Sequence, residues 1–172
     1  MGTALAAHED EAEFEQPLEF ETLVRRHQGM VFSIAFHFLQ DRSAAEELAQ
    51  DVFLQLHRYL GTLSSADHVT FWLRRVTTHR CIDYSRRRRF SFLSLDRVPE
   101  PAAEPPSRDF LLSKQLRSLI ALLPRNARIA IVLRYQGDLT PEEIARVLDR
   151  PVATVKSQLQ RALKTLREKI RT

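Results

Sequence analysis

The chain has 172 residues, of which 44% are hydrophobic and 28% are charged, with a formal net charge of +4, four glycines and one cysteine. A single cysteine, Cys81, excludes a disulfide framework and the common zinc sites, and it fits a reducing compartment. No apolar run approaches the roughly 18–20 residues that cross a membrane, and residues 1–17 are expected to form an acidic, mobile tail rather than a signal peptide. These features predict a cytoplasmic protein that is not inserted in a membrane.

The charges are unevenly distributed along the chain. Residues 1–60 carry eleven acidic residues against four arginines, whereas residues 68–90 carry seven arginines against Asp83 alone. Residues 140–172 carry eight lysines and arginines against four acidic residues. Two separate basic tracts behind an acidic head predict a polyanionic partner that is contacted at two places.

The first two helices are predicted from apolar residues that recur every three or four positions. The first helix covers residues 18–39 and places His27 on its apolar face, as a core residue with satisfied hydrogen bonds. Ser43 and Glu46 have the spacing of a capping box, so the second helix is expected to open there and to stop at Gly61. Its predicted buried stripe comprises Ala45, Leu48, Val52, Leu56 and Tyr59 or Leu60.

A third helix is expected to begin at Asp67, which is a favourable N-cap residue. Its predicted core face comprises Val69, Trp72, Leu73 and Val76. The helix ends in the basic run Arg86–Arg89, which could complement the helix dipole or form a localisation-like patch. Aromatic residues beside arginines also suit unstacked single-stranded bases, although Trp72 could equally belong to the core.

Residues 93–107 hold four prolines without an apolar period, and this predicts a flexible linker. The predicted architecture is all-α, with two small helical domains at 18–92 and 108–172. In the second domain a fourth helix is expected from Phe110 to Leu123. A fifth helix is expected over Arg125–Tyr135, with Pro124 in its first turn and Gly137 after its end.

The C-terminal pattern predicts a helix-turn-helix. Thr140 and Glu143 form a capping box around Pro141, the turn falls at residues 148–150, and a last helix runs from Pro151 to about residue 170. The last helix displays side chains that suit phosphates and base edges, namely Lys156, Ser157, Gln158, Gln160, Arg161 and Lys164. The alternative is a plain helical hairpin with a solvated basic face.

The sequence gives little indication of catalysis or of cofactor binding. The histidines lack ligand spacing, and the sequence has neither a glycine-rich phosphate loop nor a nucleophile motif, so we expect neither an enzyme nor a cofactor. The second helix displays Glu46, Glu47, Gln50 and Asp51, which form either a solvated face or a docking surface for a protein.

Three co-linear stretches resemble a known family. AEELAQDVFL from Ala45, FWLRRV from Phe71 with CIDYSRR from Cys81, and the helix-turn-helix with TVKS from Thr154 are similar to regions 2.2, 2.3–2.4 and 4 of one group of bacterial proteins. That group is the extracytoplasmic-function (ECF) sigma factors of RNA polymerase. The resemblance covers nearly all of residues 18–170.

The resemblance implies three binding surfaces. The clamp helices of the polymerase would be contacted by Glu46, Glu47, Gln50, Asp51 and Phe53. The −10 promoter element would be melted by residues 61–68 and contacted by Trp72, Arg75, His79, Arg80, Asp83, Arg86 and Arg87. The −35 element would be read by Thr140, Lys156, Ser157, Gln158, Gln160, Arg161 and Lys164, while the same domain contacts the polymerase flap.

The resemblance also implies promoter DNA, duplex and melted, as a ligand, and an anti-sigma factor as a partner. Two residues depart from the family pattern, and we expect them to alter base preference in the promoter. His79 stands where Asn is frequent, and Gln158 stands where Arg or His is usual. The competing hypothesis is a conventional helix-turn-helix regulator whose N-terminal domain senses a ligand or dimerises.

Overall fold

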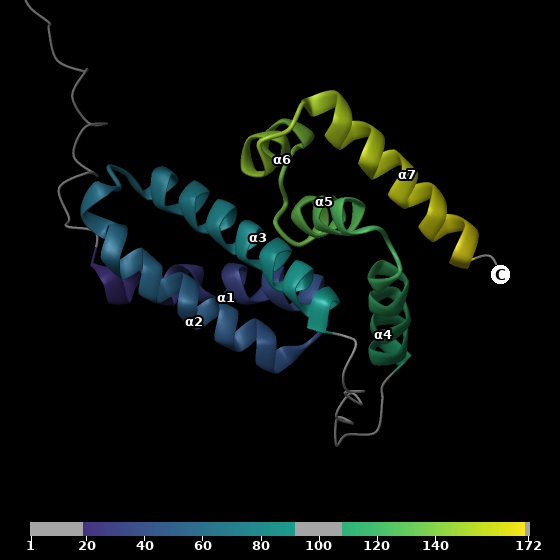
Figure 1. Ribbon diagram of the computed structural model, residues 1–172, viewed down its shortest axis with the longest axis horizontal. Helices are drawn as coiled ribbons and strands as arrows, with labels where there is room; N and C mark the ends of the chain where they lie inside the picture. The colour runs from purple at the N-terminus through teal and green to yellow at the C-terminus, as the bar shows by residue number, and fades with distance from the viewer. Residues whose placement is uncertain (1–18, 92–107, 171–172) are drawn as a thin grey trace, which may run out of the picture.

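The computed structural model describes residues 19–91 and 108–170, and every regular element within them is helical (Figure 1). The predicted tail and linker lie outside these residues. The elements are α1 (Phe20–Leu39), α2 (Arg42–Tyr59), the short 3₁₀ helix η1 (Leu60–Thr62), α3 (Ala66–Ser91), α4 (Arg108–Ala121), α5 (Arg125–Tyr135), α6 (Pro141–Leu148) and α7 (Val152–Ile170). The prediction of an all-α fold with two helical domains is therefore confirmed.

The N-terminal domain consists of α1, α2 and α3, each of which packs against the other two. Each helix contributes a stripe of apolar residues at three- and four-residue steps, as an amphipathic helix requires. The fully buried side chains include Val31, Ile34, Phe38, Val52, Leu56, Val69, Leu73 and Cys81. Burial raises the pKa of the Cys81 thiol, so this cysteine is neutral and shielded.

Two predicted helix caps in this domain are wrong. Asp41, not Ser43, caps α2, because its carboxylate accepts the Ala44 N–H at 3.0 Å, and Glu46 pairs instead with Arg42 at 2.9 Å. At the start of α3 the Ser65 hydroxyl accepts the His68 N–H at 3.1 Å, whereas Asp67 was expected to cap. In both places two neighbouring polar residues could have capped the helix, and local spacing did not distinguish them.

The end of α2 also differs from its prediction. The helix stops at Tyr59, and Gly61 lies within η1 rather than directly ending α2. The last position of the buried stripe was expected at Tyr59 or Leu60, and in the structure it is Leu60, which is half-buried and packs against the core, whereas Tyr59 is 49% exposed. Leu60 follows the buried Leu56 by four residues, which places the two side chains on the same face.

The C-terminal domain is built around α5, whose bounds match the prediction. Ile129, Ala130, Ile131, Val132 and Leu133 are all buried, so this helix is covered nearly all round. Pro124 precedes the helix as its N-cap rather than lying in its first turn. Gly137 follows its end, and a Cβ there would lie 2.8 Å from the Leu133 carbonyl oxygen, so a larger residue would displace the backbone.

The helix-turn-helix is confirmed in its elements. The Thr140 hydroxyl accepts the Glu143 N–H at 3.2 Å, and the Glu143 carboxylate accepts the Thr140 N–H at 2.7 Å. At the other end of α6, Asp149 takes the left-handed conformation with φ 53° and ψ 55°. Val155 and Leu159 of α7 are buried, and α7 packs against α5 and α6, which fixes the angle of the last helix.

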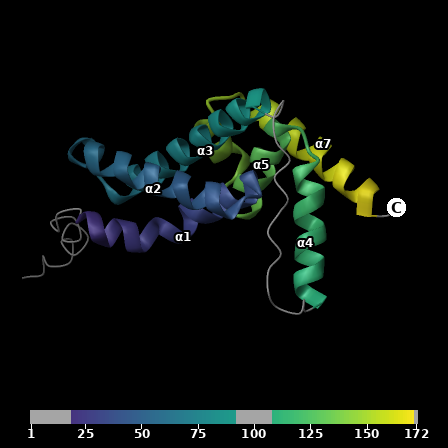
Figure 2. The ribbon, with the colours of Figure 1, turned by 60° about the horizontal axis from the view of Figure 1, so that its bottom comes forward.

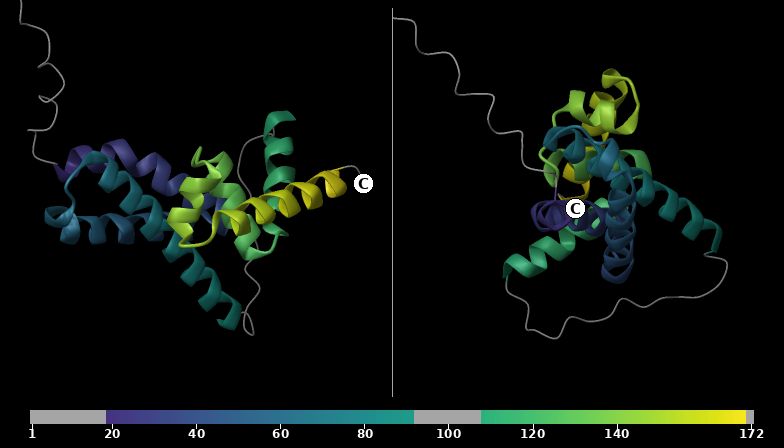
Figure 3. Two further views of the ribbon diagram at one scale, coloured as in Figure 1. Left: turned by 90° about the horizontal axis from the view of Figure 1, so that it is seen from above. Right: turned by 90° about the vertical axis from the view of Figure 1, so that its left-hand side faces the viewer.

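The two domains touch along two pairs of helices. Figures 1 and 2 show α6 lying over α3 and α5 lying beside the end of α1, and both pairs are in contact. In the view from above, α7 extends away from the N-terminal domain and α4 projects sideways (Figure 3). Within the described residues, no helix is long and apolar enough to cross a membrane.

We expect Thr140→Ala to destabilise the C-terminal domain by about 1 kcal/mol, because the substitution removes the hydroxyl of the capping box. Thr165→Ala is the matched control, since the Thr165 hydroxyl donates only to the Arg161 carbonyl within α7. Chemical denaturation of the purified proteins measures the difference. Equal stability of the two variants would contradict the assignment of the cap.

A second prediction concerns His27, which is buried on α1 and whose Nε2 has no hydrogen-bond partner among the described residues. It therefore lies in the core as predicted, but without the expected satisfaction of Nε2. Burial, followed by the charges of Arg26 and Arg74, lowers its pKa below the usual 6.5. The neutral form is thus favoured in the folded chain, and the unfolded chain binds more protons below about pH 6.5.

Stability should consequently fall as the pH drops from 6.5 toward the lowered pKa of the folded state. We expect His27→Gln to lose less melting temperature than the wild type between about pH 7.5 and about pH 5.5. His68→Gln, at an exposed position, is the control. If the melting temperature of His27→Gln fell with pH as steeply as that of the wild type, His27 would not contribute to the pH dependence of stability.

Candidate nucleic-acid interface

Most of the predicted −10 residues form one row along α3. Trp72, Arg75, His79, Asp83 and Arg86 follow one another at steps of three or four residues, which places them on one side of a helix. Arg86 and Asp83 form an exposed ion pair at 3.9 Å. The row begins beside the buried stripe of α3, because Val69 lies three residues before Trp72, and it then continues along a side of the helix that is half-buried or exposed.

Arg80 and Arg87 are exposed on the flank of this row rather than within it. Arg80 Nη2 donates a hydrogen bond of 3.1 Å to Gln55 Oε1 of α2, so its guanidinium is directed toward that helix. His79, which precedes Arg80 and belongs to the row, is half-buried. Burial and the nearby charge of Arg75 lower its pKa, although Asp83 and Asp149 act in the opposite direction.

An aromatic pair stands at the start of the row. The rings of Trp72 and Tyr59 lie 6.1 Å apart between centroids, and Tyr59 is 49% exposed beside η1. Trp72 is half-buried and packs against the core. Its position is therefore compatible with both predictions, namely a core residue and a stacking partner for an unpaired base. Sequence analysis considered Tyr59 only as an alternative to Leu60 for the buried stripe of α2, and therefore did not identify it as a partner of Trp72.

On α7, Lys156, Gln160, Arg161 and Lys164 are exposed. Lys156 Nζ lies 2.9 Å from Glu142 of α6, and the bond to Lys156 lowers the pKa of that carboxyl. Arg161 Nη2 donates to the Ser157 hydroxyl at 3.3 Å, which holds the guanidinium along the helix surface. The exposed set therefore forms a continuous basic face with hydrogen-bonding groups between the charges.

Gln158 and Thr140 are placed differently from that face. Gln158 Oε1 is buried without a hydrogen-bond partner among the described residues, and the side chain lines a cavity shared with α3. The Thr140 hydroxyl is engaged in the cap of α6. Thr140 nevertheless stands at a helix N-terminus, where backbone N–H groups favour a phosphate.

The predicted docking residues on α2 divide into two groups. Glu46, Glu47, Gln50 and Asp51 are exposed, whereas Phe53 is only 9% exposed and packs in the core. The next residue, Leu54, is 60% exposed and shares a helix face with Glu47, Gln50 and Asp51. Sequence analysis overlooked Leu54. Its spacing from Asp51 and Glu47, one and two helical turns away, places it on the same face and would have indicated that it belongs to this surface.

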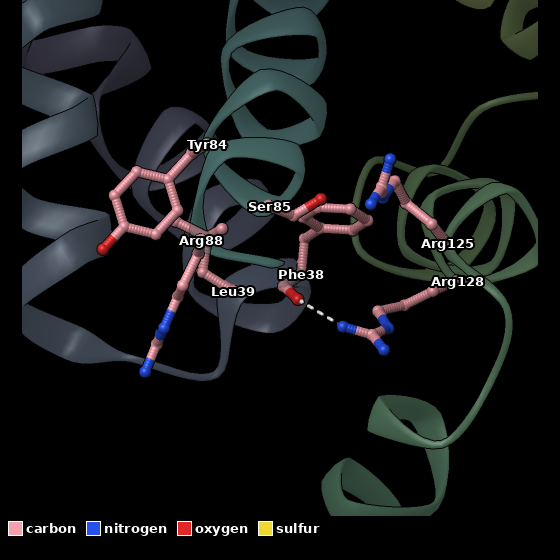
Figure 4. Close-up of a pocket in the computed structure, with 7 residues that line it drawn as sticks. All are labelled: Phe38, Leu39, Tyr84, Ser85, Arg88, Arg125 and Arg128. Carbon is pink, nitrogen blue, oxygen red and sulfur yellow. Dashed lines mark hydrogen bonds between the residues drawn. The ribbon is translucent and has the colours of Figure 1, made fainter. Parts of the chain in front are cut away.

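A larger cavity of about 430 Å³ lies between the domains (Figure 4). It is lined by Phe38, Leu39, Tyr84, Ser85, Arg88, Arg125 and Arg128. Arg128 Nη1 reaches across to the Phe38 carbonyl, and Arg88 pairs with Asp41 at 3.3 Å. Within the described residues, no group of histidine, cysteine and carboxylate side chains could hold a metal ion.

Comparison with known families matches both halves of the chain. Sigma-70 region 2 matches residues 23–91, and Sigma-70 region 4 matches residues 113–166. The first of these ranges includes the acidic α2 face and the α3 row, and the second includes the helix-turn-helix.

Curated relatives agree with these matches. The chain is 32% identical over 158 residues to the ECF RNA polymerase sigma factor SigE of Mycolicibacterium smegmatis, covering 87% of this chain and 60% of that protein. It is 26% identical to the ECF sigma factor SigW of Bacillus subtilis, covering 88% of this chain and 89% of the relative. The ECF sigma-E factor of Escherichia coli is 27% identical, with 88% and 86% covered.

Solved structures share the fold. The sigma factor RpoE of Bartonella quintana, determined in complex with the anti-sigma factor NepR, superposes with a TM-score of 0.74 at 20% identity over 89% of this chain and 97% of that one. CnrH, determined with the cytosolic domain of CnrY, gives a TM-score of 0.64 at 22% identity over 88% and 86% of the two chains. The paired family matches, the relatives and the fold agree, and the chain belongs to the ECF group of bacterial RNA polymerase sigma factors.

Proposed function

We propose that this sigma factor selects promoters through three surfaces, each carried by a different helix. The observation that carries the proposal is that one chain combines the basic and aromatic row of α3, the exposed basic face of α7 and the exposed acidic face of α2. It acts as a binding subunit and not as an enzyme, because sigma factors give specificity to a polymerase that performs the chemistry. A cytoplasmic location follows from that partner.

The α3 row and the loop before it are assigned to the −10 element. Melting a promoter requires a base to leave the stack, which costs a few kcal/mol that new contacts must offset. The neighbouring rings of Trp72 and Tyr59 offer a stacking surface next to residues 61–68. Arg75 and Arg86 supply positive charge for the backbone of the separated strand.

The exposed face of α7 is assigned to the −35 element. Arg161 and Lys156 suit guanine and phosphates, and Gln160 suits adenine. Two α6 features support this placement, because Thr140 stands at a helix N-terminus and Glu142 holds Lys156 beside the turn. The polymerase flap would be contacted by another part of the same domain.

The acidic face of α2 is assigned to the clamp helices of the polymerase. Glu47, Gln50 and Asp51 surround Leu54, so the face combines an apolar centre with a negatively charged rim. This is the composition of a protein interface, in which apolar residues contribute most of the affinity and charges contribute orientation. Phe53 would support the face from the core.

An anti-sigma factor is proposed as a further partner, because the sigma factor RpoE of Bartonella quintana, which shares this fold, was determined in complex with the anti-sigma factor NepR. A conventional helix-turn-helix regulator is disfavoured, since its N-terminal domain would have no use for a sigma region 2 over residues 23–91. The regulator would also bind duplex DNA tightly without polymerase.

Run-off transcription with cognate core polymerase tests the proposed function. We expect promoter-specific initiation that depends on this chain, and absence of initiation across a panel of promoters would contradict the proposal.

Arg161→Ala should weaken −35 recognition by about 1–3 kcal/mol, because it removes one base contact. Arg167→Ala, which removes the same charge further along α7, is the matched control and should leave sequence preference unchanged.

A substitution at Leu54 tests the polymerase surface. Leu54→Glu should weaken binding to core polymerase by at least about tenfold, since it places a charge at the apolar centre of the interface. The melting temperature should stay unchanged, because Leu54 is 60% exposed. Gln28→Glu adds the same charge at an exposed site on α1 and serves as control. Undiminished binding of Leu54→Glu in a titration of fluorescently labelled protein would refute this assignment.

A further inference from the structure

One ion pair joins the two helices of the helix-turn-helix on their exposed side. Lys156 Nζ of α7 lies 2.9 Å from a carboxylate oxygen of Glu142 in α6, and both side chains stay more than half exposed, at 55% and 57%. Glu142 belongs to the first turn of α6, so the pair bridges the turn between the helices. Lys156 is part of the basic face of α7 that is assigned to the −35 element.

The fold does not depend on this pair. Glu143, and not Glu142, closes the capping box with Thr140, and α7 is held by its own buried apolar residues. An exposed pair of a lysine and a carboxylate contributes little to stability, because water screens the charges and two flexible side chains lose freedom. The main physical effect of the pair is therefore on Lys156, whose ammonium group it holds in one place.

The Glu142 carboxylate engages the groups that a DNA phosphate would need at this place. The bond to Lys156, followed by a bond to its own backbone N–H, lowers the pKa of the Glu142 carboxyl. A lysine ammonium and the backbone N–H groups at a helix N-terminus are usual donors to a phosphate. A carboxylate that accepts from both competes with the phosphate for these donors and repels it by its own charge.

The pair affects contacts with phosphates and with bases differently. A lysine binds a phosphate largely as a point charge, and the adjacent carboxylate offsets that charge. A guanine edge is bound through directed hydrogen bonds to O6 and N7. An ammonium group has three N–H donors, so Lys156 keeps two of them when one is donated to Glu142. Arg161 differs, because its partner is the neutral Ser157 hydroxyl at 3.3 Å, which leaves the guanidinium charge in full.

We propose that Glu142 is a specificity-determining residue of the −35 surface, which withholds Lys156 from DNA phosphates and leaves its remaining donors for a base edge. The pair stays intact on DNA and lowers the affinity for every duplex, but it preserves the contact that depends on sequence. Phosphate contacts carry no sequence information, so the loss of one raises the ratio of specific to non-specific binding. This inference rests on the proposed assignment of α7 to the −35 element.

The test uses the full chain assembled with cognate core polymerase, a promoter identified by run-off transcription, and its single base-pair variants across the −35 element. In Glu142→Gln the ammonium of Lys156 is free to bind a phosphate. We expect the preference for the selected promoter over its −35 variants to fall at least about threefold. For duplex DNA without a promoter, the slope of log affinity against log salt concentration should steepen by about 0.9, the value for one additional phosphate contact.

A double-mutant cycle with Lys156→Gln separates two ways in which the carboxylate could act. In the Lys156→Gln background, Glu142→Gln should change neither the −35 preference nor the salt slope, because no ammonium remains to be released. An equal steepening of the slope in that background would mean that Glu142 acts by direct repulsion of DNA, and it would overturn the proposal. Wild-type preference together with a wild-type slope in Glu142→Gln would overturn it as well.

Glu168→Gln is the matched control, since it removes the same charge at an exposed position near the end of α7 and should change neither quantity. The cycle also distinguishes this inference from the proposed function. If Lys156→Gln kept the wild-type preference at the −35 element, the assignment of Lys156 to that element would be wrong. A reduced preference in Lys156→Gln, with none in Glu142→Gln, would contradict only the role of Glu142.

Discussion

Helix α3 has to serve two purposes at once, and the rest of the structure depends on how it does so. Val69, Leu73 and Cys81 are fully buried against α1 and α2, which requires one side of the helix to be apolar. A period of 3.6 residues then places Arg75 and His79 on another side. Once the apolar side is packed, the orientation of the charged side cannot change. The core of the N-terminal domain thus determines where the domain can meet a nucleic acid.

The fold was predictable where its signals are local. The bounds of α5 and the capping box at Thr140 follow from residues within one turn of one another, and sequence analysis identified both. The cap of α2 was missed for a long-range reason. Asp41 accepts the Ala44 N–H and also pairs with Arg88, forty-seven residues away, so its carboxylate is held in place from two directions. No spacing rule within α2 contains that second partner.

The candidate site was predictable as a set of helices but less so as a set of side chains. Adjacent residues on a helix differ by about 100° in direction, so a small error in phase exchanges a core residue for a surface one. Phe53 and Leu54 show this effect, since the predicted docking residue is buried and its neighbour is exposed. Gln158 shows a different limit. Its surroundings are supplied by α3 and α5, and no pattern within α7 reports on contacts made by another domain.

The burial of Cys81 makes this single thiol a reporter of the integrity of the N-terminal domain. The thiolate is the reactive form of cysteine, and burial both raises the pKa of the thiol and shields its sulfur atom. A thiol reagent therefore reaches Cys81 only when the packing of α1, α2 and α3 opens. The rate of modification at a fixed pH consequently measures how often this domain opens, without any introduced label.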